Sequence, residues 1–347
     1  MAIEPNFHLM APLSVTDAEI TSGPPDAENQ VYDAGTTYAT DDLVWYGGNV
    51  WQSLVDSNTG NTPVEGVNWT DLGEVDEGAD KWTAGTYALN VYKVHNSALW
   101  RSDEDSNSDE PTATSTKWTR YGATNRHKAF DGFLQDMVSQ SGGINYTLVF
   151  ADLVTDLAIM RAAGNEARVT MTDVTDGVVY DETFPLQDDS AIIDAWAYCF
   201  APFIFNDTVL VNDLPPYAGA EIVVSIEGAS ASVAQIVLGS GLALGTVKTG
   251  TSVGIESYSV KERDDFNRSI IAARPYSDTV DFDLSIPALQ VGYVKRRLAE
   301  REAIPTLYYM SDGAPYGAIA YGFSQNFDIL HSTPVIADCV LEIEGLG

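Results

Sequence analysis

Cysteine is scarce in this 347-residue sequence. The two cysteines, Cys199 and Cys339, lie in apolar strand-like runs and have no CxxC spacing. Such positions favour two buried free thiols over a disulfide, and they exclude a cysteine metal site.

Basic residues are also few. The chain has 18 Lys and Arg and 50 Asp and Glu, which gives a formal net charge of −32. This field repels phosphate backbones and anionic membranes, so we expect no nucleic-acid partner. The chain is 45% hydrophobic, which excludes the composition of a disordered protein. The balance indicates a soluble fold or one subunit of a larger assembly.

Long apolar runs and catalytic motifs are missing as well. No stretch of about 18 apolar residues occurs, and the start, MAIEPNFHLMAPLSV, has no basic segment ahead of an apolar one. We therefore expect neither an export signal nor membrane insertion. The four histidines form no HExxH, and there is no GxSxG. We expect a protein that is not an enzyme and has no cofactor, calcium aside.

An internal repeat occupies the N-terminal third of the chain. Six of the seven tryptophans precede residue 123, and matched landmarks recur about 49 residues apart. The pairs are Tyr32 and Trp82, Gly35 and Gly85, Tyr38 and Tyr87, Trp51 and Trp100, Pro63 and Pro111, Trp69 and Trp118, and Gly73 and Gly122. The sequence thus predicts two small modules, at 31–76 and 77–123, after an N-terminal arm at 1–30.

Each module is predicted to be a three-stranded β meander. Alternating apolar residues predict hairpins that turn at Gly47-Gly48 and at 95–97. A module of under about 50 residues has little aliphatic core, so large aromatics must supply its buried area. Aromatic cores are the expected role of four tryptophans, namely Trp51, Trp69, Trp100 and Trp118.

The modules resemble the small chitin-binding modules of bacterial chitinases, carbohydrate-binding module families 5 and 12. The matching residues of the first copy are Tyr32, Tyr38, Asp42, Val44, Tyr46, Gly48, Trp51, Pro63 and Trp69. Family members that hold chitin present a double-Trp segment, whereas this chain has residues 54–56 and 103–105, LVD and DED, at those positions. The resemblance implies sugar stacking on other aromatic faces. Candidate carbohydrate-binding residues are Trp45, Tyr46, Trp51, Tyr92 and Trp100.

An acidic loop in the second module, DEDSNSDE at 103–110, has the start of a calcium-loop pattern. Oxygen ligands at alternate positions could converge on Ca²⁺, and the candidates are Asp103, Asp105, Asn107 and Asp109. The sixth position is Ser108 instead of glycine, and the twelfth is Thr114 instead of an acid. A solvated turn is the alternative interpretation.

The remaining two thirds predict a larger β body. We expect a helix near 125–140, with Phe130, Leu134 and Met137 on one face, ahead of an antiparallel sandwich within 124–250. Residues 251–347 predict an α+β assembly domain with one helix near 287–302. Its cations, Lys295, Arg296, Arg297 and Arg301, are an internal counter-charge or a contact for an acidic neighbour. The predicted fold class is mainly β with a few helices.

A second resemblance lies in the C-terminal stretches VGIESYSVKERDDFNRSIIAARPYSDTVDFDL, RRLAEREAIPTLYYMSD and YGFSQNFDILHSTPVIADCVLEIEGL. They resemble tail-tip or baseplate proteins of tailed bacteriophages that also carry small chitin-binding-like modules. The resemblance implies a virion structural protein that assembles in the host cytoplasm as a ring, beside other tail proteins, with outward-facing modules for contact with host-surface polysaccharide or for decoration. The alternative is a free, lectin-like carbohydrate-binding protein.

Overall fold

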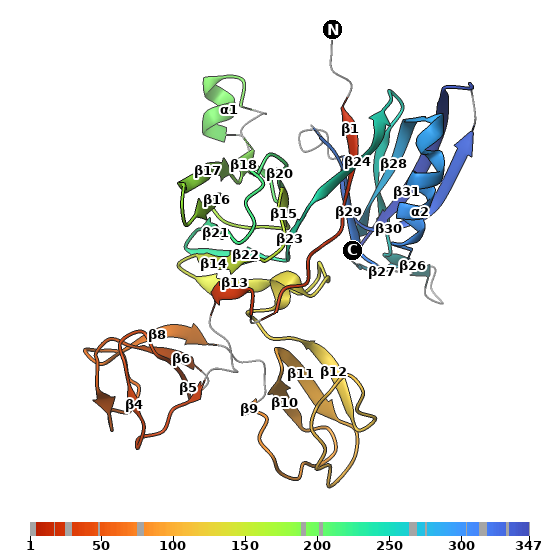
Figure 1. Cartoon of the computed structure of the whole chain (residues 1–347). Coiled ribbons are helices and arrows are strands. Elements are labelled where there is room, and N and C mark those ends of the chain that lie inside the picture. Colours follow the sequence, from red (N-terminus) through yellow and green to blue (C-terminus); the bar gives the residue numbers. More distant parts are fainter. Residues whose placement is uncertain are drawn as a thin grey trace.

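The computed structural model describes residues 5–16, 18–24, 30–47, 49–74, 80–188, 192–200, 204–263, 269–274, 276–302, 304–311, 318–330 and 333–346. Gly48 of the first predicted turn, and 264–268 within a stretch of the tail-protein resemblance, lie outside these residues. The described chain is mainly β, as predicted, and consists of two small modules below a body of two larger sheet assemblies (Figure 1).

Each module contains the predicted antiparallel three-stranded meander, with a short parallel strand added at one edge. In the first module a two-residue pair also joins β4 and β7. The strands are β3 (Gln30–Val31), β4 (Thr37–Tyr38), β5 (Leu43–Tyr46), β6 (Asn49–Ser53), β7 (Asn58–Thr59), β8 (Trp69–Glu74), β9 (Asp80–Lys81), β10 (Tyr92–His95), β11 (Ala98–Ser102) and β12 (Trp118–Ala123). The predicted turns hold, since Gly47, Asn96 and Ser97 have positive φ.

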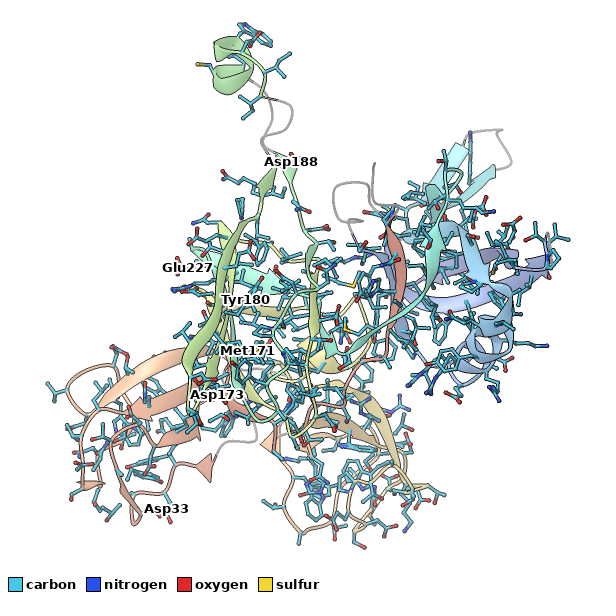
Figure 2. The ribbon with its side chains drawn as sticks, turned by 45° about the horizontal axis from the view of Figure 1, so that its top comes forward. Asp33, Met171, Asp173, Tyr180, Asp188 and Glu227 are labelled. Atoms are coloured by element: carbon cyan, nitrogen blue, oxygen red, sulfur yellow. The ribbon has the colours of Figure 1, made fainter. Side chains whose placement is uncertain are left out.

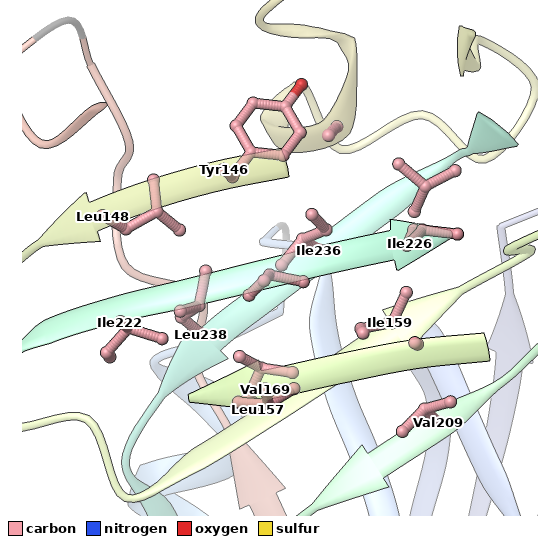
Figure 3. Packing of buried hydrophobic residues seen from close by; sticks show 14 of the residues in the cluster. Tyr146, Leu148, Leu157, Ile159, Val169, Val209, Ile222, Ile226, Ile236 and Leu238 are labelled. Atoms are coloured by element: carbon pink, nitrogen blue, oxygen red, sulfur yellow. The ribbon is translucent and has the colours of Figure 1, made fainter. Parts of the chain in front are cut away.

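The predicted sandwich is present in the middle of the chain. A five-stranded sheet, in the order β17-β16-β21-β14-β2, packs on a three-stranded sheet, in the order β20-β15-β23, and aliphatic side chains of both meet in one core (Figure 3). The strands are β2 (Ile20–Ser22), β14 (Ile144–Val149), β15 (Asp156–Met160), β16 (Glu166–Asp173), β17 (Gly177–Pro185), β20 (Val209–Val211), β21 (Glu221–Glu227) and β23 (Gln235–Gly239); β13 (Val138–Ser141) pairs beside them with β22 (Ser230–Val233).

The three-stranded sheet is buried on both faces, which explains the unbroken apolar runs of β15 and β23. Leu157 and Ile159 point into the sandwich core, while Ala158 and Met160 point into a second cluster. That second cluster includes Leu307 and other residues of the C-terminal sheet. The two assemblies therefore share this thin sheet as a common wall.

The C-terminal sheet closes on itself. Its order is β24-β1-β29-β30-β31-β28-β25, and β24 also pairs with β28, so six strands form a ring and β25 extends from its side. The strands are β1 (Asn6–Met10), β24 (Gly241–Val247), β25 (Ser252–Ser257), β28 (Tyr276–Pro287), β29 (Thr306–Met310), β30 (Ile319–Leu330) and β31 (Ile336–Gly345), with β26 (Val260–Arg263) and β27 (Ser269–Ala272) paired apart from it. The expected N-terminal arm instead supplies β1 to this ring and β2 to the sandwich.

The predicted C-terminal helix is present as η2 (Ala288–Gln290) followed by α2 (Val291–Ala299). Val294 and Leu298, one turn apart, are buried in the core of the closed sheet, so the opposite face of α2 is turned outward. No helix among the described residues is long and apolar enough to cross a membrane.

The helix predicted near 125–140 is wrong beyond its first turn. Only η1 (Lys128–Phe130) forms, and Gly132 then has φ 85°. The Asp131 carboxylate accepts the Phe133 N–H at 2.8 Å, and Gln235 accepts the Gly132 N–H at 3.1 Å. These side-chain bonds compete with helical ones, and the chain continues into β13 as a strand.

The strand predicted around Cys199 is also wrong, because α1 (Ala195–Phe200) forms there. It lies beyond a two-stranded stalk, β18 (Gln187–Asp188) and β19 (Ile204–Phe205), and stands away from the sandwich past Asp188 (Figure 2). Both cysteines are free, as predicted, but only Cys339 is buried and Cys199 is exposed. The apolar run that suggested burial is a projecting tip.

Candidate functional site

The last tryptophan of each module closes the module by the same pair of contacts. The ring N–H of Trp69 donates to the Asn61 carbonyl at 2.9 Å, and that of Trp118 donates to the Asp109 carbonyl at 2.8 Å. Both rings are buried, and each packs edge-on against a tyrosine, Tyr38 or Tyr87. The predicted aromatic cores are confirmed.

A buried asparagine holds the long loop of each module in place. The Asn107 amide donates to Ser102 Oγ at 3.1 Å and to the Lys117 carbonyl at 3.0 Å. Asn58 makes the same bonds to Ser53 and to the Asn68 carbonyl in the first module. The repeat is thus a repeat of hydrogen bonds as well as of aromatic residues.

The two modules touch through equivalent positions. Val50, Val94 and Leu99 are buried in one cluster that includes residues of both modules, and three half-buried side chains pack against it. With the repeat offset of about 49 residues, the six form three equivalent pairs: Leu43 and Tyr92, Trp45 and Val94, Val50 and Leu99. The contact is therefore close to self-complementary.

The five sugar-stacking candidates differ in how much of each ring is free. Trp100 is 5% exposed in the core of the second module, and Trp51 is half-buried against the core of the first module. Trp45 and Tyr92 pack into the contact between the modules. Tyr46 is 40% exposed. Of the five, Tyr46 is the residue whose face is best placed for a sugar ring.

One exposed aromatic was missed by the sequence analysis. Tyr121, in β12, is 66% exposed and meets Tyr92 edge to face at a centroid distance of 5.4 Å. Tyr46 meets Tyr32 in the same way at 5.5 Å. Each module thus carries a tyrosine pair with one exposed ring. Alternation along β12 does not reveal Tyr121, because residues 119–121 are all exposed and the register shifts opposite Leu99 and Trp100.

The acidic loop does not bring its four predicted ligands together. Asp103 accepts bonds from Thr119 and Arg101, which lower its pKa, and Asp105 accepts the Leu89 N–H at 3.0 Å. Asp109 lies 3.4 Å from Lys117, and Asn107 is buried as described above. Among the described residues, no group of three or more His, Cys, Asp and Glu side chains is placed to hold a metal ion.

The predicted assembly cations lie on the outer side of α2 and just after it. Lys295, Arg296 and Arg297 are exposed, and Arg301 is half-buried. Arg297 pairs with Glu300 at 2.9 Å and covers the Tyr293 ring at 5.3 Å. Exposure of this kind supports a contact for a neighbour more than an internal counter-charge.

A cleft of about 410 Å³ separates the second module from the body. Its lining includes Ser97 and Arg120 of the module, and Thr16, His127 and Asp131 of the body. Burial is the main cause that raises the pKa of Asp131 to about 6. Sequence reasoning missed this group, because the cleft is formed by segments far apart in the chain.

Taken together, the fold and these sites define a mainly β protein with tandem aromatic modules on a two-part body. Comparison with known proteins gave no match: no family model, no curated protein and no solved structure matches this chain.

Proposed function

We propose that this chain is a structural protein of a tailed-phage virion, placed at the distal tail, whose body assembles as a ring and whose tandem modules face the host surface. The observation that supports the proposal is the division of the molecule into a large body and two small modules. A body with outward cationic and apolar surfaces lies apart from two modules, and the second module connects to it directly through residues 124–131 (Figure 1). The two sequence resemblances point the same way.

The modules supply the host contact in this proposal. Each presents one exposed tyrosine ring beside a second tyrosine, Tyr46 by Tyr32 and Tyr121 by Tyr92. Such faces suit the C–H groups of sugar rings. The surrounding charge is negative, so neutral polysaccharides are the expected ligands.

The assembly part is tested by solution mass and by virion content. Light scattering over a range of concentrations should give a discrete oligomer, and mass spectrometry should find the chain in purified phage particles. A chain that stays monomeric and is absent from virions would refute the proposal.

The alternative, a free carbohydrate-binding protein, is favoured by the same exposed tyrosines. It requires retention on a polysaccharide column by a monomer, with retention weakened up to about tenfold in Tyr46→Ala and Tyr121→Ala, since a contact with one aromatic ring is worth about 0.5–1.5 kcal/mol. Val67→Ala, a change of an exposed module residue outside both pairs, is the matched control. No retention on any polysaccharide would exclude this alternative.

A further inference from the structure

The tip of the α1 hairpin carries several exposed apolar side chains. Trp196 and Phe200 are each 69% exposed, Ile193 is exposed beside them, and the two aromatic rings lie 5.4 Å apart. One Trp and one Phe together can bury about 300–500 Å². The largest apolar patch of a monomer has about this size and is often an interaction site. We refer to Ile193, Trp196, Cys199 and Phe200 as the α1 tip.

The outward side of α2 is a second apolar surface, and its charge is opposite. Leu289 is fully exposed, and Tyr293 and Arg296 follow it at helical spacing. Val335 lies at the end of this row, because its carbonyl accepts the Ala288 N–H at 2.8 Å, and its side chain is exposed. We refer to Leu289, Tyr293, Arg296, Arg297 and Val335 as the α2 face.

The charges of the two surfaces are complementary. The hairpin segment 187–208 has four acidic residues and no basic one, whereas 289–302 has four basic residues against two acidic ones. The whole chain carries −32, so two copies repel one another over most of their surfaces. The α2 face is a place where a copy of this chain meets opposite charge.

The two surfaces cannot meet within one molecule. In Figures 1 and 2, α1 stands beyond the sandwich on one side, while α2 lies on the far side of the closed sheet. An apolar projection that fits a different surface of the same molecule makes a head-to-tail contact, which closes into a ring or extends as a filament.

We infer that the α1 tip of one copy docks on the α2 face of a second copy. Trp196 and Phe200 cover Leu289, Tyr293 and Val335, and the acidic flanks of the hairpin lie beside Arg296 and Arg297. This contact deepens the proposed function, because it names the surfaces that join neighbouring subunits, and it rests on that proposal only in requiring self-assembly.

Surface variants of the full chain test the contact by light scattering. Trp196→Ser with Phe200→Ser should weaken self-association by about thirtyfold or more, as expected for a central aromatic anchor. Arg296→Glu with Arg297→Glu should weaken it by more than about tenfold, through like-charge repulsion. Tyr121→Ser and Arg274→Glu change exposed residues elsewhere and should leave the mass unchanged.

Mixing the two defective variants gives a sharper test. Each variant retains the surface that the other lacks, so an equimolar mixture should form a heterodimer with one intact contact at concentrations where neither variant associates alone. This result would also prove that both variants are folded. A symmetric contact between like surfaces predicts no such rescue.

Three results would overturn the inference. If the wild-type chain assembles and the tip variant assembles equally well, the contact is wrong while the proposed assembly stands. If the wild-type chain is monomeric at every concentration and no mixture rescues, the contact is excluded, and virion content alone then decides the proposed function. If the monomer binds neutral phosphatidylcholine vesicles and the Trp196→Ser variant does not, the α1 tip binds a lipid surface and not a second copy of the chain.

Discussion

The Tyr309 hydroxyl, in β29 of the closed sheet, donates a hydrogen bond to the Asp156 carboxylate at the start of β15 in the sandwich. The second carboxylate oxygen of Asp156 accepts the Gly241 N–H at 2.7 Å. A Cβ at Gly241 would overlap both Tyr309 and Asp156, so only glycine fits this crossing. One buried carboxylate thus ties together the two halves of the body.

Tyr309→Phe should lower the free energy of unfolding by about 1.5–3 kcal/mol, the range for a hydrogen bond to a charged group. Burial, and after it the hydrogen bond to Asp156, raises the pKa of Tyr309 above that of an unfolded tyrosine, about 10. The stability that Tyr309 contributes is therefore fully present at neutral pH and is lost as the pH rises above about 10. Urea unfolding at pH 7 measures the first effect, and a pH series measures the second. Tyr121→Phe, at an exposed ring, should change neither.

Asp131 should make stability depend on pH between about 4 and 6. Its pKa is raised from 3.8 to about 6, so the folded chain keeps a proton there that the unfolded chain has lost. Stability from this group therefore falls as pH rises through that range. Asp131→Asn should gain about 1 kcal/mol relative to wild type at pH 7 and little at pH 4, after allowance for solvent screening.

The free energy of unfolding of wild type and of Asp131→Asn is measured in urea at several pH values. The difference between the two proteins is then compared across pH, so that the contributions of other carboxyl groups cancel. Asp136→Asn, at an exposed neighbour that raises the Asp131 pKa, should shift the same midpoint slightly downward. An equal difference between wild type and Asp131→Asn at pH 4 and pH 7 would contradict the prediction.

Leu99→Ala should destabilise both modules, although Leu99 lies in only one of them. Its side chain is buried against Val50 of the other module, so the change leaves a cavity at the contact and costs about 2–3 kcal/mol. Hydrogen exchange should show weaker protection of β6 as well as β11. Leu89→Ala removes an exposed leucine of the same module and should leave β6 protection unchanged.

At concentrations where the chain is monomeric, so that the α1 tip is uncovered, the native chain should react with one equivalent of maleimide, at Cys199. Cys199 is exposed, while burial raises the pKa of Cys339 to about 12 and keeps it protonated, and the thiolate is the reactive form. Mass spectrometry should show one adduct in buffer and two in denaturant. Cys199→Ser should abolish native labelling; two rapid adducts on the native chain would mean that Cys339 is accessible.

Much of the architecture could be predicted from local pattern. The tryptophan repeat, the hairpin turns and the short strands of the sandwich are properties of short segments, and the structure confirms them. The helix predicted near 125–140 failed because Asp131 and Gln235 compete for its backbone N–H groups, and Gln235 is distant in sequence.

The site was harder to predict, because exposure depends on tertiary contacts. Trp45 and Tyr46 are adjacent and equally aromatic, yet one packs between the modules and the other faces solvent. Likewise, an apolar run such as 195–200 has the same composition whether it is a core strand or a projecting tip. Only the fold distinguishes these cases.

The position of β1 in the closed sheet determines the order in which parts of the protein fold during synthesis. Asn6 pairs with Thr246 and Phe7 with Met310, so this strand leaves the ribosome long before either partner exists. At cellular rates of synthesis it waits on the order of ten seconds or more. The tandem modules can complete their cores during that interval, whereas the closed sheet must form last, around an apolar strand that has to be shielded until then.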